Sequence, residues 1–300
     1  MTRRGWTLFA AMSVIWGMPY LFIKVAVEDV EPAVVVFGRT TLAGVVLLAI
    51  ALPRGHLAPV LRHWKPLLAF AAIEMVIPWL MLNHAEVHLP SGLTGLLVAC
   101  VPLAAVVVAY LLGDHHALRP VRLAGIAVGL GGVALLVGGD LNSDSGVPWL
   151  SVGQVMVVCV CYAVGPFIVA RRLADVPSLG VVSLSLCVAA VVVAPLAWLD
   201  RPDSVPPADA LWSIVGLALI CSALAFIVFF ALIEAIGPDR ATLITFVNPA
   251  VAVLLGAVFL DEAITAATVG GFVLVLAGCW LATRPAVNAE PTPAESALRP

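Results

Sequence analysis

The stretch RATLITFVNPAVAVLLGAVFLDE, residues 240–262, determines how the rest of the chain is interpreted. It is an apolar run with Pro249 inside it and two acids, Asp261 and Glu262, at its end. A weaker copy, LTGLLVACVPLAAVVVAYLLGD, occupies residues 93–114, and its Pro102 lies 147 residues before Pro249. Because internal repeats determine the architecture of a chain, we interpret this sequence as a duplication.

The duplication extends to both sides of these runs. Pro19 and Pro166 are also 147 residues apart, in the segments WGMPYLFIK and AVGPFIVAR. Glycines follow the long runs at matching places, Gly125 with Gly271 and Gly132 with Gly278, each pair 146 residues apart. The second and third apolar runs of the two halves match only in hydropathy.

We therefore predict one repeat at residues 1–140 and a second at 141–284. The remaining segment, 285–300, is polar and contains several prolines, which predicts a disordered cytoplasmic tail.

The composition indicates a lipid environment. Hydrophobic residues make up 62% of the chain and charged residues 11%, whereas a soluble domain is about half apolar and about a quarter charged. The six cysteines all fall inside apolar runs without metal-ligand spacing, so we interpret them as small core residues. The sequence has no basic stripe, which gives no reason to expect a nucleic acid partner.

Ten apolar runs are long enough to be membrane helices, since a hydrocarbon core of ~30 Å needs ~20 residues. They are residues 6–27, 32–52, 66–83, 91–112, 120–138, 149–170, 178–199, 210–235, 239–260 and 264–283. The predicted fold class is therefore an all-α integral membrane protein with ten transmembrane helices.

Lysine and arginine placement predicts the orientation of these helices. With the N-terminus inside, twelve basic residues lie in inner links and the tail, and Arg201 alone lies outside. The twelve are Arg3, Arg4, Arg54, Arg62, Lys65, Arg119, Arg122, Arg171, Arg172, Arg240, Arg284 and Arg299. We expect a multi-pass protein of the cell membrane with both termini in the cytoplasm.

The odd number of helices in each repeat has a consequence for symmetry. After five helices the chain is on the opposite side of the membrane. The second repeat must therefore cross the membrane in the inverted orientation. Inverted repeats are typical of secondary transporters that work by alternating access.

Two charged residues lie deep inside predicted spans, where a charge is costly unless it faces a cavity or a partner. Glu74 is a candidate for proton coupling or for binding a substrate amine, because a carboxyl group without water favours its protonated form. It could also be a neutral acid bonded to a neighbouring helix. Arg39 could bind a substrate carboxylate or phosphate, or pair with Glu74. Lys24, near a span end, could reach the interface or contact a gate.

Other candidates are aromatic, polar or helix-breaking residues within spans. The substrate-binding or coupling candidates, with Arg39 and Glu74, are Trp16, Tyr20, Trp79, Tyr162, Thr245 and Asn248. The hinge candidates are the prolines expected to interrupt helices, Pro19, Pro102, Pro166 and Pro249. We expect His84, Glu86, His88, His115 and His116 to lie solvated in links.

Other classes of membrane protein fit less well. A channel would need a continuous polar stripe, and the polar residues here are isolated. A membrane enzyme would need clustered catalytic groups, but the predicted topology places His84 and His88 outside and His115 and His116 inside. No phosphate-binding loop, metal site or cofactor motif is present in the sequence.

Four segments resemble the EamA-like ten-helix branch of the drug/metabolite transporter superfamily. They are WGMPYLFIK (16–24), FGRTTLAG (37–44), HLPSGLTGLLVACVPLAAVVVAYLLGD (88–114) and ALIEAIGPDRATLITFVNPAVAVLLGAVFLDE (231–262). Residues Trp16, Lys24, Arg39, Pro102, Asp114, Pro249 and Glu262 match the family pattern, with Asp114 where glutamate is more usual. Glu74 is not part of that pattern.

The resemblance implies a bacterial inner-membrane permease, often an exporter of amino acids or other small metabolites, with a central cavity lined by both halves. The expected partners are a small-molecule substrate, the lipid bilayer and protons. A multidrug exporter of lipophilic cations and an organic-anion or nucleotide-sugar exchanger are the alternatives.

Overall fold

A computed structural model describes residues 2–114, 119–139 and 148–283, and every regular element in these residues is helical. The first repeat contains α1 (Arg3–Gly17), α2 (Pro19–Val27), α3 (Pro32–Ala51), α4 (Leu57–Leu61), α5 (Trp64–Ala71), the π-helical turn η1 (Ala72–Val76), α6 (Ile77–His88), α7 (Ser91–Val98), α8 (Val101–Leu111) and α9 (Pro120–Gly139). The second contains α10 (Trp149–Arg172), α11 (Ser178–Leu199), α12 (Ala208–Ala218), the π-helical turn η3 (Leu219–Leu224), α13 (Ala225–Ile236), α14 (Pro238–Ala241), the 3₁₀ turn η4 (Thr242–Phe246), α15 (Asn248–Phe259) and α16 (Ala266–Thr283).

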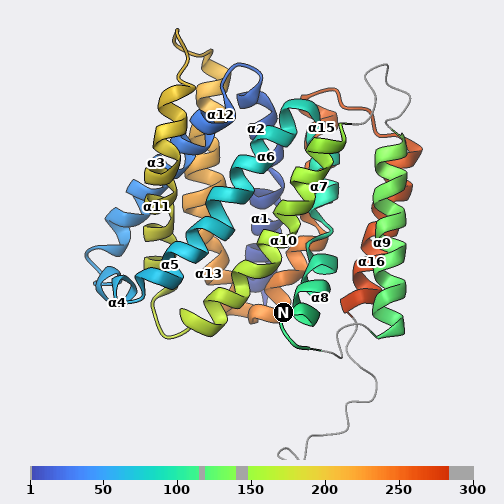
Figure 1. The fold of residues 1–300 in the computed structure, drawn as a ribbon, viewed down its shortest axis with the longest axis horizontal. Coiled ribbons are helices and arrows are strands. Elements are labelled where there is room, and N and C mark those ends of the chain that lie inside the picture. The colour runs from blue at the N-terminus through green and yellow to red at the C-terminus, as the bar shows by residue number, and fades with distance from the viewer. Residues whose placement is uncertain (1, 115–118, 140–147, 284–300) are drawn as a thin grey trace, which may run out of the picture.

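These helices make ten passages along one bundle (Figure 1). Among the described residues, nine passages are long and apolar enough to cross a membrane. The remaining passage is broken, because the short α15 follows α14 and η4 rather than continuing from one straight helix. The predicted ten-helix membrane fold is confirmed.

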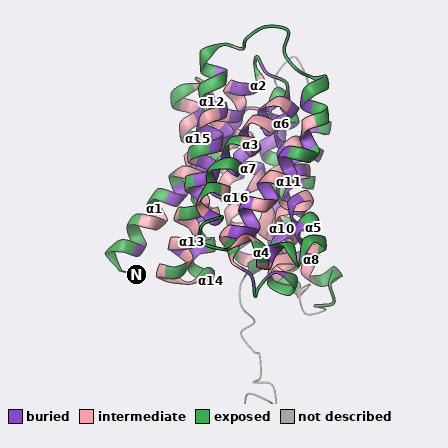
Figure 2. Ribbon diagram, turned by 90° about the vertical axis from the view of Figure 1, so that its left-hand side faces the viewer, coloured by how far each residue is buried: buried purple, intermediate pink, exposed green. Residues whose placement is uncertain are grey.

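The two repeats run in opposite directions through the bundle. We call the end where α1 begins, which also holds α4 and the end of α8, the proximal end. The end that holds α2 and the start of α12 is the distal end (Figures 1 and 2). The first helix of the second repeat, α10, starts at the distal end (Figure 1). The inverted arrangement therefore follows from the odd number of passages in each repeat.

The packing between the repeats has two-fold symmetry. Helices α3 and α9 each pack against their own counterparts, α11 and α16. Glycines make the last of these contacts close: a Cβ on Gly125 would lie 2.7 Å from the carbonyl oxygen of Gly278, and one on Gly271 would lie 2.9 Å from that of Gly132. The two contacts exchange under the sequence repeat, which is what a two-fold axis requires.

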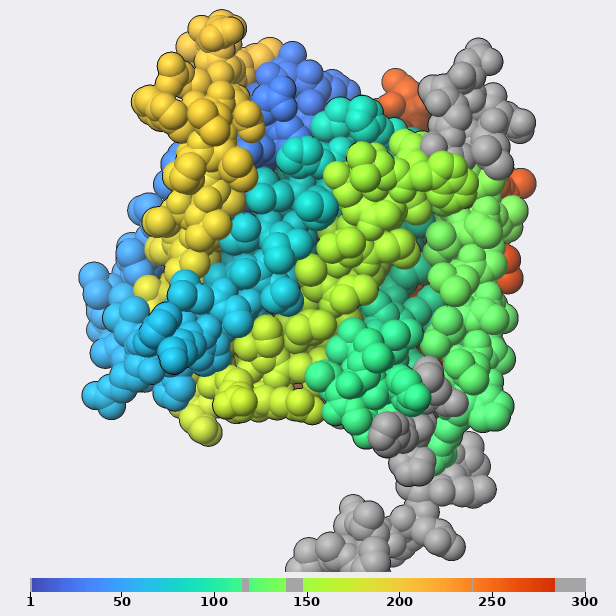
Figure 3. Space-filling model, in the orientation of Figure 1, coloured from blue at the N-terminus to red at the C-terminus, as the bar shows by residue number. Residues whose placement is uncertain are grey.

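The buried residues of the bundle are mostly apolar, and many large apolar side chains are exposed. Figure 2 shows where the buried and the exposed residues lie along the ribbon. Five of the six cysteines are buried and Cys187 is partly buried, as expected for core residues. On the face shown in Figure 3, α5 and α6 of the first repeat lie beside α10 of the second, so the repeats interleave. Exposed leucine, valine and tryptophan side chains are stable on such a surface only in lipid.

Three of the four prolines predicted to interrupt helices do so. Pro19 begins α2 after a break at Met18, Pro102 follows the break between α7 and α8, and Pro249 follows the break at Val247. Pro166 does not, since α10 runs through it without interruption. A proline removes one backbone hydrogen bond, and the packing of α10 against α6 and α8 keeps the turns on either side helical.

The predicted division between residues 140 and 141, the tail 285–300, His115 and His116 lie outside the described residues.

Candidate functional site

Arg39 lies in the middle of the bundle and joins the two repeats. Its side chain is 6% exposed. Arg39 Nε donates a hydrogen bond of 2.9 Å to Ser222 Oγ in the second repeat, and Ser222 Oγ donates one of 2.8 Å to the carbonyl oxygen of Leu217. The guanidinium stacks on Trp79, with its carbon 3.6 Å from the ring centroid. This stacking stabilises a buried cation without neutralising its charge.

Two π-helical turns lie at equivalent places in the two repeats and carry polar groups of this site. The turns begin at Ala72 and Leu219, 147 residues apart, in the third passage of each repeat. The first turn contains Glu74 and the second contains Ser222. π-Helical turns are rare and occur frequently at functional sites. Their matching positions show that the third passages share a structural feature that their sequences do not.

Glu74 packs against a glycine of the second repeat. A Cβ added to Gly165 would overlap Glu74 Oε2 and lie 2.9 Å from the carboxyl carbon, so the glycine provides the space for this carboxyl group. Oε2 is buried without a hydrogen-bond partner in the described part of the chain. No ion pair joins Glu74 to Arg39 among the described residues. The pairing of these two charges is therefore not present in this conformation.

The two tyrosines complete the surroundings of Arg39. Tyr20 is 8% exposed and Tyr162 is partly buried. Both hydroxyl groups interact electrostatically with the guanidinium, and Tyr162 also forms a side-chain hydrogen bond with Trp79. The structure thus brings together Tyr20, Arg39, Trp79 and Tyr162, with Glu74 beside Tyr162.

The other three candidates lie elsewhere. Trp16 packs against Phe229 and Phe226, with ring centroids 4.6 and 6.4 Å apart. Asn248, in the amide orientation that fits its surroundings, donates to the carbonyl oxygens of Ser13 and Ile244 at 3.1 and 3.0 Å. Thr245 Oγ1 donates to the carbonyl oxygen of Thr242 at 2.8 Å. Thr245 and Asn248 therefore satisfy backbone carbonyls at the broken passage.

Glu86 is a buried acid, and the prediction that it lies solvated in a link is wrong. Helix α6 continues to His88, and Glu86 is 0% exposed. His84 and His88 are exposed, but they also lie in this helix and not in a link as expected. The polar residues that follow Asn83 predict an end of the span near this position. The signal that could have found Glu86 is its spacing, because Trp79, Asn83 and Glu86 recur on one helical face.

Lys24 contacts Glu86 rather than simply reaching the interface. Lys24 Nζ donates a hydrogen bond of 2.8 Å to the main-chain oxygen of Glu86. Both carboxyl oxygens of Glu86 are buried without a hydrogen-bond partner in the residues that the structure describes. This half of the bundle thus holds a second unpartnered carboxyl group.

Glu262 closes the distal end by binding the start of a helix from the other repeat. Its Oε1 and Oε2 accept hydrogen bonds of 2.6 and 2.8 Å from the backbone N–H groups of Ser91 and Gly92. A Cβ on Gly256 would overlap Glu262 Oε2, so this glycine makes room for the carboxylate. A carboxylate is stabilised at a helix N-terminus by the unpaired N–H groups and the helix dipole.

The EamA-like transporter family matches this chain twice, over residues 3–138 and 149–284. The chain belongs to the EamA-like transporter family. It is therefore a multi-pass membrane transporter and not an enzyme.

Several EamA-like and related proteins are similar over most of their length. The inner membrane transporter YedA of Escherichia coli K12 is 32% identical over 82% of this chain and 79% of YedA. A protein of Streptantibioticus cattleyicolor named "Probable terminal-alkyne amino-acid exporter" is 26% identical over 95% of this chain and 94% of that protein. A solved crystal structure, 23% identical, aligns with a TM-score of 0.66 over 93% of this chain and 96% of its own, which supports the fold alone.

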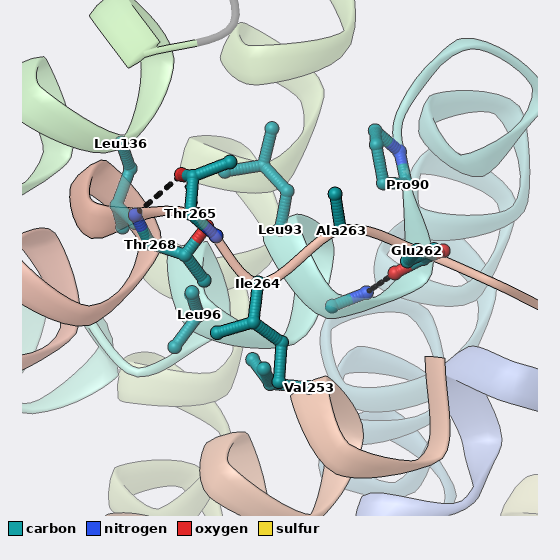
Figure 4. A pocket seen from close by; sticks show the side chains of 11 residues that line it. Pro90, Leu93, Leu96, Leu136, Val253, Glu262, Ala263, Ile264, Thr265 and Thr268 are labelled. Atoms are coloured by element: carbon teal, nitrogen blue, oxygen red, sulfur yellow. Dashed lines mark hydrogen bonds between the residues drawn. The ribbon is translucent and has the colours of Figure 1, made fainter. Parts of the chain in front are cut away.

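A surface pocket of this EamA-like protein is separate from Arg39. It lies at the distal end under the link that follows Glu262, between α7 and α15 (Figure 4). Leu93, Leu96, Leu136, Val253 and Ile264 make its wall apolar, and Thr265 and Thr268 bond to each other at 2.9 Å. A second opening nearby is lined by Lys24, Glu28, His88, Pro90, Leu260 and Glu262. Neither pocket includes Arg39 or Glu74 in its lining.

Proposed function

We propose that this protein is a secondary active exporter of small metabolites, amino acids foremost, in the cell membrane. It works by alternating access between its inverted repeats, with both termini in the cytoplasm. The observation that carries the substrate class is Arg39, a buried arginine between the repeats that has no carboxylate partner in the described residues.

The arginine is suited to a carboxylate because its position is fixed and its charge is not neutralised. The bond to Ser222 uses Nε, and the stacking on Trp79 uses one face of the guanidinium. The remaining N–H groups form a planar donor set that matches a carboxylate. Binding between two inverted repeats near the middle of the bundle is the arrangement of many secondary transporters.

Alternating access and export have separate support. The inter-repeat contacts of α9 with α16 are two-fold symmetric, and the distal end is closed by Glu262 on the start of α7. Two similar halves in opposite orientation can exchange conformations. The name of the Streptantibioticus cattleyicolor relative supports export and an amino-acid substrate.

Glu74 is the group that we propose to couple transport to protons. Its Oε2 is buried without a described partner, and it lies in a π-helical turn against the second repeat. The variant Glu74→Gln keeps the shape and removes the exchangeable proton. We expect it to abolish the pH dependence of transport in proteoliposomes, and an unchanged pH profile would exclude this role.

Two other substrate classes each have one observation in their favour. Trp16 with Phe226 and Phe229, together with the unpartnered Glu74, would suit a lipophilic cation and hence a multidrug exporter. Arg39 with Lys24 would suit an organic anion or a nucleotide sugar. The bond from Lys24 to the main chain of Glu86 leaves Arg39 as the main anion contact.

Thermal stabilisation of the purified protein tests the substrate class, because a ligand that binds the folded state raises its apparent stability. The panel contains the common amino acids, small organic anions and lipophilic cations. We expect stabilisation by amino acids that is lost in Arg39→Gln. The matched control is Arg201→Gln, since Arg201 also stacks on a tryptophan, Trp198 at 4.6 Å, but lies exposed.

A stabilising amino acid should then be carried by proteoliposomes that contain the wild-type protein and not by those that contain Arg39→Gln. Stabilisation by lipophilic cations alone, lost in Glu74→Gln, would replace this proposal with the multidrug exporter.

A further inference from the structure

Glu86 is a carboxyl group that is buried inside the bundle and could accept a cationic partner. Its side chain is 0% exposed, and neither carboxyl oxygen has a hydrogen-bond partner among the described residues. Buried carboxyl groups without partners are uncommon because desolvation is not compensated. A ligand that binds the carboxyl oxygens would explain why they have no partner within the protein.

The neighbouring charges do not supply that partner. Lys24 Nζ bonds to the main-chain oxygen of Glu86, and the structure shows no ion pair from it to the carboxyl group in the described residues. Glu262 also interacts electrostatically with Glu86, but it is an acid that is already fixed on Ser91 and Gly92. The carboxyl oxygens of Glu86 are therefore left available.

Arg39 is the cation whose free N–H donors complement the free oxygens of Glu86. Glu86 interacts electrostatically with Arg39, and Tyr20 interacts with both. Arg39 has unused N–H donors and Glu86 has unused acceptors, yet the two do not form an ion pair in the described residues. A ligand that carries one anionic and one cationic group would satisfy both residues at once.

We infer that Glu86 is the subsite for the ammonium group of a zwitterionic substrate whose carboxylate binds Arg39. This inference rests on the proposed function and adds the reason why an amino acid would be preferred to a simple carboxylic acid. An ammonium group has three N–H donors, which suit the two free oxygens of the Glu86 carboxyl group. Lys24 and Arg39 are the cations that face this carboxylate when the substrate is absent.

Glu28 is the matched control for this assignment. It is another glutamate near Lys24, since both line the distal opening, but its side chain is exposed. It is not among the groups that interact with Arg39. Its replacement should not change the recognition of an ammonium group next to Arg39.

The experiment compares an amino acid with its two halves in binding to the purified full-length protein. For leucine the probes are 4-methylpentanoate, which lacks the amino group, and 3-methylbutylamine, which lacks the carboxylate. If another amino acid stabilises the protein better, its corresponding analogues are used. We expect the wild-type protein to bind the amino acid about tenfold or more tightly than the des-amino acid, as one charged hydrogen bond provides.

Glu86→Gln should remove that preference by weakening the binding of the amino acid alone, whereas Glu28→Gln should retain it. Glu86→Asp keeps the charge and should retain part of the preference, which shows that a loss in Glu86→Gln does not come from misfolding. Equal binding of both acids by the wild type, or an undiminished preference in Glu86→Gln, would overturn the inference and leave the proposed function intact.

A failure of the proposed function would give different binding results. If no carboxylic acid binds, or if Arg39→Gln binds both acids as the wild type does, the anion site itself is wrong. Binding of 3-methylbutylamine without any need for Arg39 would overturn the zwitterion subsite in favour of a cation exporter.

Discussion

Glu262 shows how a single side chain can connect the two repeats. It comes from the link after α15, and both of its oxygens bind the first N–H groups of α7. These N–H groups have no partner within their own helix, so a carboxylate supplies what the helix lacks. Hydrogen bonds that involve a charged group are stronger than neutral ones.

We expect Glu262→Gln to destabilise the protein by about 1–2 kcal/mol, because it removes the charge that interacts with the start of α7. The measurement is the thermal unfolding midpoint in detergent at one scan rate. Glu28→Gln is the control, since Glu28 lines the same distal opening, lies exposed and should change stability by less than about 0.5 kcal/mol. Equal effects of the two variants would show that the helix contact does not stabilise the bundle.

Charged residues well inside an apolar run could be recognised from the sequence, and those near its ends could not. Arg39 and Glu74 were recognised because apolar residues flank them on both sides. Glu86 was missed because its neighbours, His84 and His88, are polar and face outward. Partners could not be predicted at all: the bond from Arg39 to Ser222 joins residues 183 positions apart.

The elements differ in how well their sequences define them. Helix limits follow from length, charge and proline, so most predicted spans agree closely with the observed passages, although the third continues to His88 instead of ending at residue 83. The π-helical turns at Ala72 and Leu219 have no residue signature, since each is an extra residue accommodated within a helix by its packing.

Helix α10 is shaped to accept Glu74, which gives a prediction for two of its glycines. Gly165→Ala would place a methyl group on the Glu74 carboxyl group and should destabilise the protein by about 1–3 kcal/mol. Gly153→Ala, on the same helix with nothing within 4 Å of the added Cβ, should be neutral or slightly stabilising.

A double-mutant cycle with Glu74→Ala separates this contact from a general effect of the helix. Because the carboxyl group is then absent, Gly165→Ala should lose most of its effect on the unfolding midpoint. An effect of the same size in both backgrounds would mean that Glu74 does not occupy this position.

The contact between α9 and α16 provides a second matched pair of glycines. A Cβ on Gly132 would lie 2.8 Å from the Gly271 carbonyl oxygen and 2.8 Å from the Val275 nitrogen, backbone atoms that cannot move aside easily. We expect Gly132→Ala to destabilise the bundle by about 1–3 kcal/mol in thermal unfolding. Gly131→Ala, where the added Cβ meets nothing within 4 Å, should leave the midpoint unchanged. Similar effects at both positions would indicate a loss of helix flexibility instead of a steric conflict.

The whole molecule is an inverted duplication, but the charged groups of the site have no charged counterparts in the second repeat. The residues 147 positions after Arg39, Glu74 and Glu86 are Leu186, Cys221 and Ile233. The scaffold is therefore two-fold symmetric, whereas the polar site belongs mainly to the first repeat. The symmetry could be predicted from proline and glycine spacing. The interleaving of α5 and α6 with α10 could not, because it depends on side-chain fit between distant segments.

The orientation of the bundle in the membrane is the last prediction, and it follows from the charge of its two ends. The exposed Arg62 lies in the link after α4 at the proximal end, whereas the exposed Glu28 follows α2 at the distal end. Basic residues are retained on the cytoplasmic side during insertion, so the proximal end should face the cytoplasm. A membrane-impermeant maleimide should label Glu28→Cys in intact cells and Arg62→Cys only after permeabilisation. The unmodified chain gives the background, because five of its six cysteines are buried. Labelling of Arg62→Cys but not Glu28→Cys in intact cells would invert the topology and place the Glu262 closure on the cytoplasmic side.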